Sequence, residues 1–520
     1  MKEGQNKLTK ADWLVIVVLF IIGFGIRLYP EIKAGYWPIG YDSFNAYLSD
    51  IVKFDGNFWR WILSENLLYF LMWPFYKLGA DPSWVVKITG SVLYGALAAA
   101  SFIFSRKYLK WPLLPSVLTG LLVLVQLPAL RMSWDLFRNI LGLILLLPAI
   151  YFLENNHTTK NYILTVIFSL LIVLSNQLAA AVWFVIVLVW IIIKLFKKDF
   201  KGGLKIIGAI VPAALLFVLA VKMPLLNDFN GQVIYKGETA SRIFHYFVIY
   251  KDQMAYKDWA SLIGGLFQFN YKFIWPLVLI GLVFLRKKTV LLILAFWLLF
   301  GTFSSLIFGG YGLFVWSRWL YMLFLPFTFF AAAALFGAGE IFARLKLYQK
   351  NKIFRFTSKS IAAILLAGYL FVFIYTNYPF VATPTVKASA PFLNSKYNEY
   401  QPPSMLNNAV GFENLSNILS CIDYVNENAP DEAIIMIDNR YRGIGLLKLD
   451  YSKKMLYIYP WSKKIPSKNV KEILDGNYGP IYTIWDSGAT PKNFEKVYTS
   501  GVTSVYREKS SYVEYKKNFE

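Results

Sequence analysis

Long runs of apolar residues follow one another through the first 377 residues, separated by short polar segments. A helix needs about 20 apolar residues to cross a hydrocarbon core, and eleven runs reach or approach that length. These runs are residues 11–29, 85–105, 112–130, 136–153, 162–174, 178–193, 204–221, 273–285, 290–308, 313–336 and 361–375. The pattern predicts a polytopic α-helical membrane protein with about eleven transmembrane helices. A further run, 67–78, contains Pro74 and Lys77, and its length suits an interfacial or re-entrant segment.

The composition changes after the last run. Residues 378–412 are rich in Pro, Asn, Ser and Tyr and read as a connector. From residue 413 the pattern predicts a small α/β domain, with a helix over 415–428 and strands over 433–437, 455–459 and 480–485. The predicted organisation is therefore a membrane domain (1–377), the connector and a C-terminal domain (413–520). Within the membrane domain, 30–84 form the first outer loop and 222–272 a second long one.

The charge distribution predicts the orientation. The chain is 57% hydrophobic with a mean hydropathy of +0.46, yet its formal net charge is +22. If run 67–78 does not cross, every dense basic cluster falls on the side of the N-terminus, at 106–110, 194–205, 286–288 and 344–359. Cytoplasmic loops carry such an excess of Lys and Arg. We therefore expect a multi-pass protein of the cell membrane, with the N-terminus cytoplasmic and the C-terminal domain extracytoplasmic, and no nucleic-acid partner.

Several kinds of site are disfavoured by composition. Cys421 is the only cysteine, which rules out an intrachain disulfide and disfavours a Cys-based metal site. His157 and His245 are the only histidines, so His-rich metal chemistry and a redox cofactor site are not indicated. The chain has no GxxxxGK phosphate-binding loop, so ATP-driven transport has no support.

Charged and polar residues gather where the predicted topology brings chain segments to the outer face. They are Asp42, Arg131, Asp135, Arg138, Asn176, Gln177 and Arg318, with Lys77 as a further candidate for lipid phosphate. A carboxylate can take a proton from a hydroxyl nucleophile, and Arg binds phosphate with a planar fork. The set therefore suits glycosyl transfer from a lipid phosphate. Each residue also has a structural alternative: Asp42 could cap a helix, Asp135 could cap the next helix or pair with Arg138, and Arg131 and Arg318 could be interfacial anchors.

Several segments together resemble the GT-C superfamily of integral membrane glycosyltransferases, which includes mannosyltransferases that use polyprenyl-phosphate sugars and the aminoarabinose transferases of lipid A. These segments are GYDSFNAY at 40–47, LLYFLMWPFYKLG at 67–79, RMSWDLFRNILGL at 131–143, LSNQ at 174–177 and SRWLYMLFLP at 317–326. The resemblance implies a catalytic acidic residue in the first outer loop, which is Asp42, and a second acidic position, which is Asp135. It implies a polyprenyl-phosphate-linked sugar as donor and a lipid, glycan or protein as acceptor.

The sequence also departs from parts of that family. Many members have paired acidic residues in the first loop, whereas here Ser43 follows Asp42, and the oligosaccharyltransferase signature WWDYG is absent. We therefore expect an inverting transfer of a single sugar, with Asp42 as base or substrate orienter, Asp135 as its partner and Arg131, Arg138 and Arg318 holding phosphate. No cofactor is certain, although Asp42 and Asp135 could hold a divalent metal. The alternatives are a non-enzymatic lipid or glycan transporter and a membrane scaffold.

Overall fold

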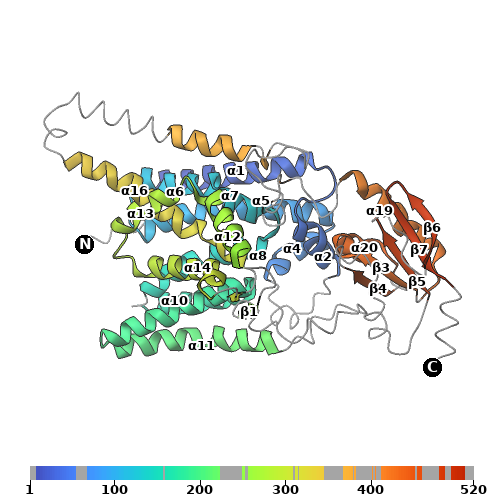
Figure 1. Cartoon of the computed structure of the whole chain (residues 1–520). Coiled ribbons are helices and arrows are strands. Elements are labelled where there is room, and N and C mark those ends of the chain that lie inside the picture. Colours follow the sequence, from blue (N-terminus) through green and yellow to red (C-terminus); the bar gives the residue numbers. More distant parts are fainter. Residues whose placement is uncertain are drawn as a thin grey trace.

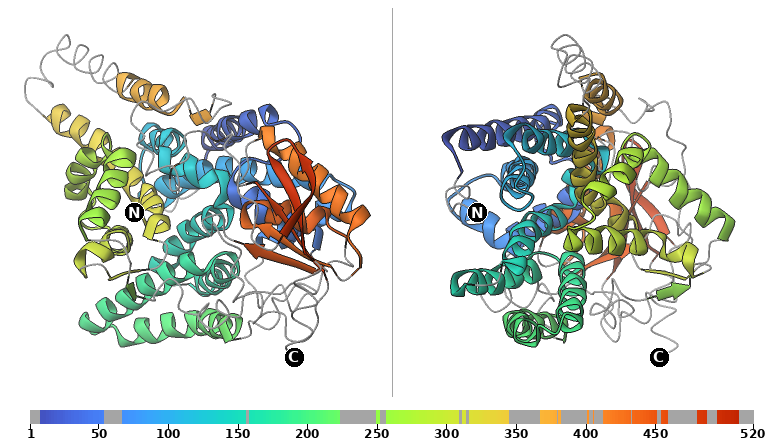
Figure 2. Two further views of the ribbon diagram at one scale, coloured as in Figure 1. Left: turned by 45° about the vertical axis from the view of Figure 1, so that its right-hand side comes forward. Right: turned by 90° about the vertical axis from the view of Figure 1, so that its left-hand side faces the viewer.

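The computed structural model describes most of the membrane domain and the core of the C-terminal domain. The described residues are 8–53, 67–155, 158–222, 249–251, 256–308, 311–313, 316–344, 367–378, 380–381, 401, 405, 412–431, 433–450, 454–458, 480–486 and 494–509. In Figure 1 the long helices lie together and the C-terminal sheet sits at one end of them. Figure 2 gives two further views of the same arrangement. The molecule is therefore a helical body with a sheet domain placed on one end.

Seven helices of the described part are long and apolar enough to cross a membrane. They are α1 (Lys10–Lys33), α5 (Pro82–Lys107), α8 (Phe137–Glu154), α10 (Gln177–Phe196), α11 (Phe200–Lys222), α14 (Thr289–Ile307) and the stretch Trp316–Gly337, which contains α15 (Trp316–Met322) and most of α16 (Phe324–Arg344). If each bent helix pair counts as one span, the number rises to nine. A chain with these helices is a multi-pass membrane protein, because in lipid a helix satisfies its own backbone groups.

The two bent pairs and one shorter helix account for three more of the predicted runs. The pairs are α6 (Leu113–Val125) with α7 (Leu127–Asp135), bent by 59°, and α12 (Tyr256–Tyr271) with α13 (Trp275–Phe284), bent by 73°. The shorter apolar helix is α9 (Thr159–Ser175). Of the eleventh run, residues 367–375 are helical and 361–366 lie outside the described residues. The polytopic helical fold is thus confirmed, and the total of eleven spans stays a prediction.

The run predicted as one span over 112–130 is broken at Gln126, and residues 131–135, which separate it from the next predicted run, form the last turn of α7. Pro128 has no N–H to donate to the carbonyl of Leu124, and its ring would clash with that carbonyl in a continuous helix. The freed carbonyls find other donors: the Tyr94 hydroxyl donates to the oxygen of Leu124 at 3.0 Å, and the Asn377 amide donates to that of Val125. Arg131 and Asp135 therefore lie on α7, whose axis is bent away from that of α6.

The short run after the first loop forms α4 (Leu67–Lys77), an 11-residue helix that contains Pro74. At about 1.5 Å per residue it is too short to cross a hydrocarbon core of about 30 Å. The first loop itself contains a π-helix, η2 (Ser43–Tyr47), followed by α2 (Leu48–Lys53). A two-stranded ladder pairs β1 (Ile249–Lys251) with β2 (Tyr311–Leu313).

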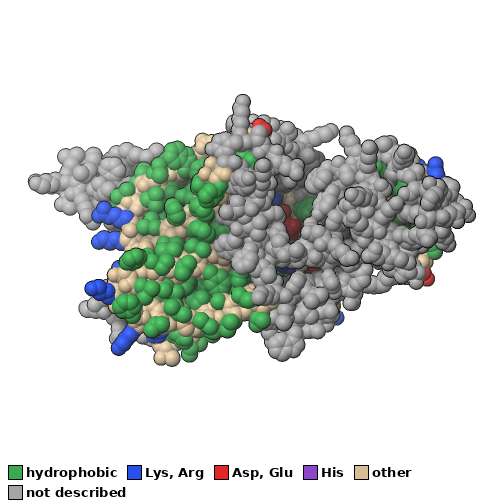
Figure 3. Space-filling view, turned by 60° about the horizontal axis from the view of Figure 1, so that its bottom comes forward, with side chains coloured by type: hydrophobic (Ala, Val, Ile, Leu, Met, Phe, Trp, Pro, Cys, Tyr) green, Lys and Arg blue, Asp and Glu red, His purple; other side chains and the backbone are tan. Residues whose placement is uncertain are grey.

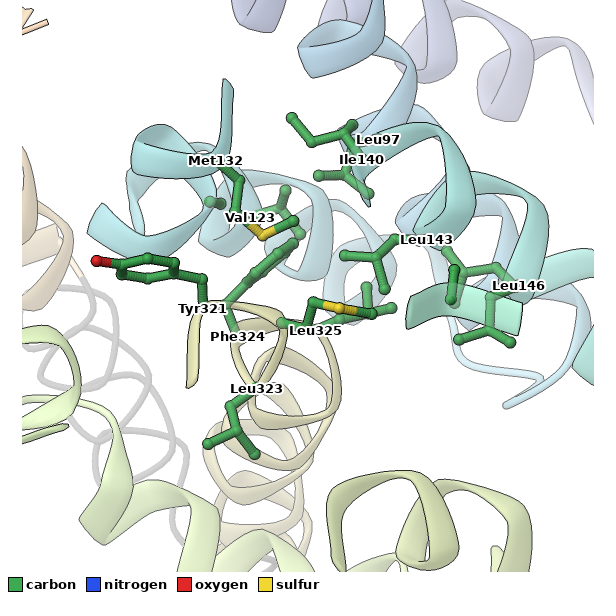
Figure 4. Close-up of a cluster of buried hydrophobic side chains, with 14 of the residues drawn as sticks. Leu97, Val123, Met132, Ile140, Leu143, Leu146, Tyr321, Leu323, Phe324 and Leu325 are labelled. Carbon is green, nitrogen blue, oxygen red and sulfur yellow. The ribbon is translucent and has the colours of Figure 1, made fainter. Parts of the chain in front are cut away.

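A buried apolar core ties the broken span to its neighbours. Figure 4 shows side chains from α5, α6, α7, α8, α15 and α16 packed together, including Leu97, Val123, Met132 and Ile140. Phe324 and Leu325 at the start of α16 fill the same core and are fully buried. The Tyr321 ring lies at its edge, with the hydroxyl turned away from the cluster. This packing fixes α7 and α15, the two short helices that carry Arg131, Asp135 and Arg318.

The C-terminal region contains a five-stranded mixed sheet in the order β4-β3-β5-β7-β6. Strands β4 (Lys454–Ile458), β3 (Ile434–Asp438) and β5 (Ile481–Trp485) are parallel, and β7 (Thr503–Glu508) and β6 (Phe494–Ser500) are antiparallel. Every residue of β3 and β5 is buried, as expected for strands covered on both faces. Helices α19 (Phe412–Asn428) and α20 (Arg442–Lys448) pack with this sheet. The predicted helix and three strands are confirmed, whereas α20, β6 and β7 were missed; the boundaries at 377 and 412 stay predictions.

One end of the helical body is rich in basic side chains. Figure 3 shows Lys and Arg side chains gathered along the end of the apolar surface that lies away from the C-terminal sheet. A basic end of this kind is what the positive-inside rule expects on the cytoplasmic side. The orientation across a membrane stays a prediction.

Candidate functional site

The first loop is pinned to the C-terminal end of α7. The Ser43 hydroxyl donates to the carbonyl of Trp134 at 2.8 Å, and the Tyr47 hydroxyl donates to the carbonyl of Asp135 at 2.9 Å. The last carbonyls of a helix lack partners within the helix, so these two hydroxyls satisfy acceptors that would otherwise be unpaired. The two bonds bring Asp42, the residue before Ser43, to the end of α7 that carries Asp135.

Gly40 makes this approach possible. Its φ of +89° is strained for any residue with a Cβ atom. A Cβ atom there would also overlap the Trp134 carbonyl and lie 3.2 Å from the Cβ of Asp135. The loop can therefore pass this close to α7 only with glycine at position 40.

Asp42 lies immediately before η2, and π-helical turns occur often at functional sites. Its side chain makes no capping hydrogen bond, so the alternative reading as a helix cap is wrong. Instead, its Oδ2 lies 3.8 Å from Nη2 of Arg318, and each of these side chains is 29% exposed. The carboxylate is thus partly accessible and faces a guanidinium that comes from α15, far away in the sequence.

Asp135 forms a second carboxylate–guanidinium pair. Its Oδ1 lies 2.5 Å from Nη1 of Arg131, one turn earlier on α7, and both residues are buried. The pair is therefore with Arg131 and not with Arg138. The Arg131 guanidinium also lies 5.3 Å from the centre of the Trp134 ring and 5.7 Å from that of Tyr321. Aromatic rings that flank a guanidinium restrict its orientation, so the Arg131 fork is held in a defined position.

Arg138, on the first turn of α8, lies among aromatic side chains. Its guanidinium is 4.9 Å from the centre of the Tyr69 ring, and the Tyr69 hydroxyl donates to Asp50 at 2.5 Å. The Nε of Arg138 is buried without a hydrogen-bond partner among the described residues. The Tyr47 ring stacks on that of Phe137, the residue before Arg138, with 4.9 Å between the ring centres. We call the side of the site formed by Arg138, Tyr69, Tyr47 and Phe137 its aromatic wall.

The charged groups act on one another. Burial raises the pKa of the Asp42 carboxyl to about 6, and the negative charge of Asp135 adds to this effect. The positive charges of Arg318, Arg131 and Arg138 oppose it. Five of the residues selected from the sequence therefore share one electrostatic site at the end of the helical body that faces the C-terminal sheet.

The other three candidates form no hydrogen bond or ion pair with these five groups among the described residues. Lys77 is exposed and lies over the rings of Trp73 and Tyr76, at 5.6 and 6.0 Å from their centres. Asn176 caps α10 by accepting the Ala179 N–H at 3.0 Å, which is a structural role. Gln177 is the first residue of α10. Their part in binding stays a prediction.

A metal ion is not strongly indicated by the donor set. Within the described residues, no group of three or more His, Cys, Asp and Glu side chains converges. Asp42 and Asp135 each face an arginine. Mg²⁺ is commonly bound by one or two carboxylates, with phosphate and water completing its shell. The two aspartates would fit an ion only in that form, and metal dependence stays a prediction.

A buried network of charged residues adjoins the site and was not predicted from the sequence. Arg27 Nη2 binds Glu31 Oε1 at 2.6 Å, and Arg27 Nε donates to the carbonyl of Ser133 at 2.7 Å. Glu31 Oε2 accepts the N–H of Ile39 at 3.0 Å. Lys87 donates to the carbonyls of Glu31 and Gly35. The sequence contained a signal for this network, because Arg27 is a charged residue inside an apolar run and Glu31 follows it by one helical turn.

Comparison with known proteins supports the fold. No protein-family model matches the chain, and no curated protein matches its sequence. Among solved structures, the crystal structure of ArnT from Cupriavidus metallidurans bound to undecaprenyl phosphate is similar, with a TM-score of 0.54 and 11% sequence identity. The match covers 97% of this chain and 99% of that one. It confirms the fold expected from the GT-C resemblance over nearly the whole chain.

Proposed function

We propose that this protein is a membrane glycosyltransferase that moves a single sugar from a polyprenyl-phosphate donor to an acceptor hydroxyl. The observation that carries the proposal is the meeting of Asp42 with Arg318, and of Asp135 with Arg131, at one end of the helical body. The similar fold of ArnT, in a structure bound to undecaprenyl phosphate, supports a polyprenyl-phosphate ligand.

In this proposal Asp42 is the general base. Its carboxylate takes the proton from the acceptor hydroxyl as the oxygen attacks the anomeric carbon of the sugar. A bond forms between that oxygen and the carbon, and the bond between the carbon and the phosphate oxygen breaks on the opposite face. The configuration is therefore inverted, and the electron pair leaves with the polyprenyl phosphate. A base with a pKa of about 6 is ionised at neutral pH and still accepts a proton in the transition state.

The arginines stabilise the leaving group. The phosphate gains negative charge as the glycosidic bond breaks, and cations already held in place stabilise it most effectively. Arg131 is fixed by Asp135 and two aromatic rings, and Arg318 reaches the same region from α15. Arg138 contributes positive charge from the wall formed with Tyr69. Asp135 orients Arg131 and raises the basicity of Asp42 by its own charge.

The orientation belongs to the same proposal. The basic end of the helical body faces the cytoplasm, so the site and the C-terminal sheet lie on the extracytoplasmic side. Donor and acceptor therefore meet outside the cytoplasm, at the surface of the membrane.

The test is transfer of labelled sugar from polyprenyl-phosphate donors by protein reconstituted in lipid. We expect Asp42→Asn to lower the rate by about 10² to 10⁴-fold, the usual contribution of a general base. Asp423→Asn, an exposed carboxylate on α19, is the matched control and should transfer normally. Equal rates for wild type and Asp42→Asn would remove Asp42 from the mechanism. No transfer by any variant, with any donor, would favour the transporter or scaffold alternatives.

A further inference from the structure

The π-helix η2 is held from two sides. Ser43 and Tyr47, four residues apart, bind the carbonyls of Trp134 and Asp135 at the end of α7. Phe44 and Asn45 point to the other side, toward the C-terminal domain. The segment that follows Asp42 is therefore shared between the membrane domain and the C-terminal domain.

The contact with the C-terminal domain is close and buried. Phe44 is 1% exposed and belongs to the apolar core of the C-terminal domain, together with Ile418, Tyr441 and Ile444. The Oδ1 atom of Asn45 accepts the N–H of Gly443, on the first turn of α20, at 3.1 Å. Asn45 is also buried, so an acceptor left here without the Gly443 N–H while the two surfaces stay together would be unsatisfied.

Gly443 permits this contact by its lack of a side chain. A Cβ atom at position 443 would overlap the carbonyl oxygen of Phe44 and lie 2.6 Å from the Cα of Asn45. Both are backbone atoms, so a rotamer change of a side chain cannot relieve the overlap. An alanine at this position must move α20 away from η2.

From this geometry we infer that the C-terminal domain is a positioning element for the reaction: Gly443 and Asn45 lock η2 so that Asp42 keeps its place beside Arg318 and Asp135. The inference rests on the proposed function of Asp42. Among the described residues neither Gly443 nor Asn45 forms a hydrogen bond or ion pair with Asp42, Arg318 or Asp135, so both would act through the backbone of η2. With the contact to α20 lost, the hydrogen bonds of Ser43 and Tyr47 and the stacking of Tyr47 on Phe137 would still hold the face of η2 that meets α7 and α8. The face that carries Phe44 and Asn45 would lose its support and could shift.

The substitution Gly443→Ala tests this directly. Alanine is the better helix former by about 1 kcal/mol, so α20 itself is not weakened by the change. Gly264→Ala on α12 is the matched control, because a Cβ atom there meets no described atom within 4 Å. Asn45→Ala is a second variant, which removes the acceptor without adding volume and serves if Gly443→Ala does not fold.

Two measurements are made on the full-length protein in lipid. Hydrogen–deuterium exchange of peptides covering residues 40–48 reports whether η2 is loosened. Sugar transfer reports kcat and the donor KM. For Gly443→Ala we expect faster exchange over 40–48, a kcat lower by about 10²-fold, as misplacement by about 1 Å produces, and an unchanged donor KM.

The pH profile adds a readout that general destabilisation would not move. A loosened η2 admits water to Asp42, so burial would raise its pKa less. The charges that face Asp42 are those of Asp135 and Arg131 on α7, Arg138 on α8 and Arg318 on α15, and none of them changes in the variant. The acid limb of the kcat/KM profile should therefore move to lower pH in Gly443→Ala and stay in place in Gly264→Ala.

The possible outcomes distinguish a failure of this inference from a failure of the proposed glycosyltransferase function. Faster exchange together with a lower kcat supports the inference. Faster exchange with normal kcat, or exchange equal to that of the control, overturns it and leaves the proposed function standing. A wild type that transfers sugar from no donor overturns the proposed function, and the exchange comparison still decides whether Gly443 orders η2.

Discussion

Nη2 of Arg27 lies 2.6 Å from Oε1 of Glu31, one helical turn further along α1, and neither side chain is exposed. The pair bridges the two segments that carry the candidate carboxylates. Arg27 also binds the carbonyl of Ser133, two residues before Asp135, and Glu31 binds the N–H of Ile39, three residues before Asp42. The buried Arg27–Glu31 ion pair therefore helps to fix the distance between the segment that carries Asp42 and the segment that carries Asp135.

The first prediction concerns the stability of this pair. Glu31→Ala should lower the free energy of unfolding by about 3–5 kcal/mol, because it leaves the Arg27 charge buried and unpaired. Glu495→Ala is the control: Glu495 pairs with Arg507 at the same 2.6 Å, but these side chains are 43% and 50% exposed. Exposed pairs contribute about 0–1 kcal/mol. The check is thermal or chemical unfolding of both variants in detergent. Equal losses of unfolding free energy in the two variants would contradict the claim that burial makes the Arg27–Glu31 pair the more important one.

The second prediction concerns Gly40. Gly40→Ala should reduce both stability and transfer, because alanine is strained at φ +89° and its Cβ would push the Trp134 carbonyl away. Gly35→Ala separates the two causes, since Gly35 has a φ of +76° but its Cβ would meet no described atom within 4 Å. We expect Gly35→Ala to lower the free energy of unfolding only by the cost of the left-handed backbone conformation, about 1–2 kcal/mol, and to retain sugar transfer. Similar transfer by the two variants would mean that the contact with α7 does not matter.

The third prediction is the pH dependence of the reaction. Asp42 acts as a base only when ionised, and its pKa is raised to about 6, so kcat/KM should rise with pH up to about 6 and then level off. Below pH 6 the carboxyl binds a proton, and the rate should fall about tenfold per pH unit. A profile that is flat between pH 5 and 8 would show that no group of this pKa controls the reaction.

The fourth prediction is that substitutions of the charged neighbours of Asp42 shift the acid limb of the kcat/KM profile, the part that rises up to about pH 6, in opposite directions. Asp135→Asn removes a negative charge that raises the pKa of Asp42, so the limb should move to lower pH. Arg318→Gln removes a positive charge that lowers it, so the limb should move to higher pH. The two profiles are measured beside wild type at one ionic strength. Shifts of the same sign would rule out the assignment of the limb to Asp42.

The fifth prediction concerns recognition of phosphate. Arg131→Lys keeps the charge but loses the planar fork that Asp135, Trp134 and Tyr321 hold in place. We expect the donor KM to rise about tenfold or more, the equivalent of one lost charge-assisted hydrogen bond of about 1.5–3 kcal/mol. Lys448→Arg at the exposed end of α20 is the control. An unchanged KM would place the donor phosphate away from Arg131.

Much of the architecture could be predicted from local patterns. A run of about 20 apolar residues can bury its backbone in lipid only as a helix, so the polytopic fold followed from residue type and spacing alone. The buried strands β3 and β5 were visible for a similar reason, since AIIMI and PIYTIW have no polar alternation. Less regular pieces were missed: β6 is mixed in burial, and α20 has only seven residues.

The composition of the candidate site was also within reach of the sequence, but its pairing was not. The expectation that polar residues at the ends of apolar runs meet at one membrane face selected Asp42, Asp135 and the three arginines. It also selected Lys77, Asn176 and Gln177, which have no hydrogen bond or ion pair with those five among the described residues. Their partners depend on distances between segments far apart in the chain, as in the bond between Ser43 and Trp134, 91 positions away. Pro128 was visible in the sequence, yet the bend that it causes depends on Tyr94 and Asn377 to satisfy the freed carbonyls.

The sequence by itself thus determined which segments form long apolar helices and which chemical groups gather at one end of them, because hydrophobicity and charge act on each residue where it stands. Only the tertiary structure decided that Asp42 faces Arg318, that Asp135 pairs with Arg131, and that Gly443 of the C-terminal domain packs against η2. These relationships depend on how close two backbones come. That closeness results from the packing of the whole chain and is not encoded in the spacing of any one segment.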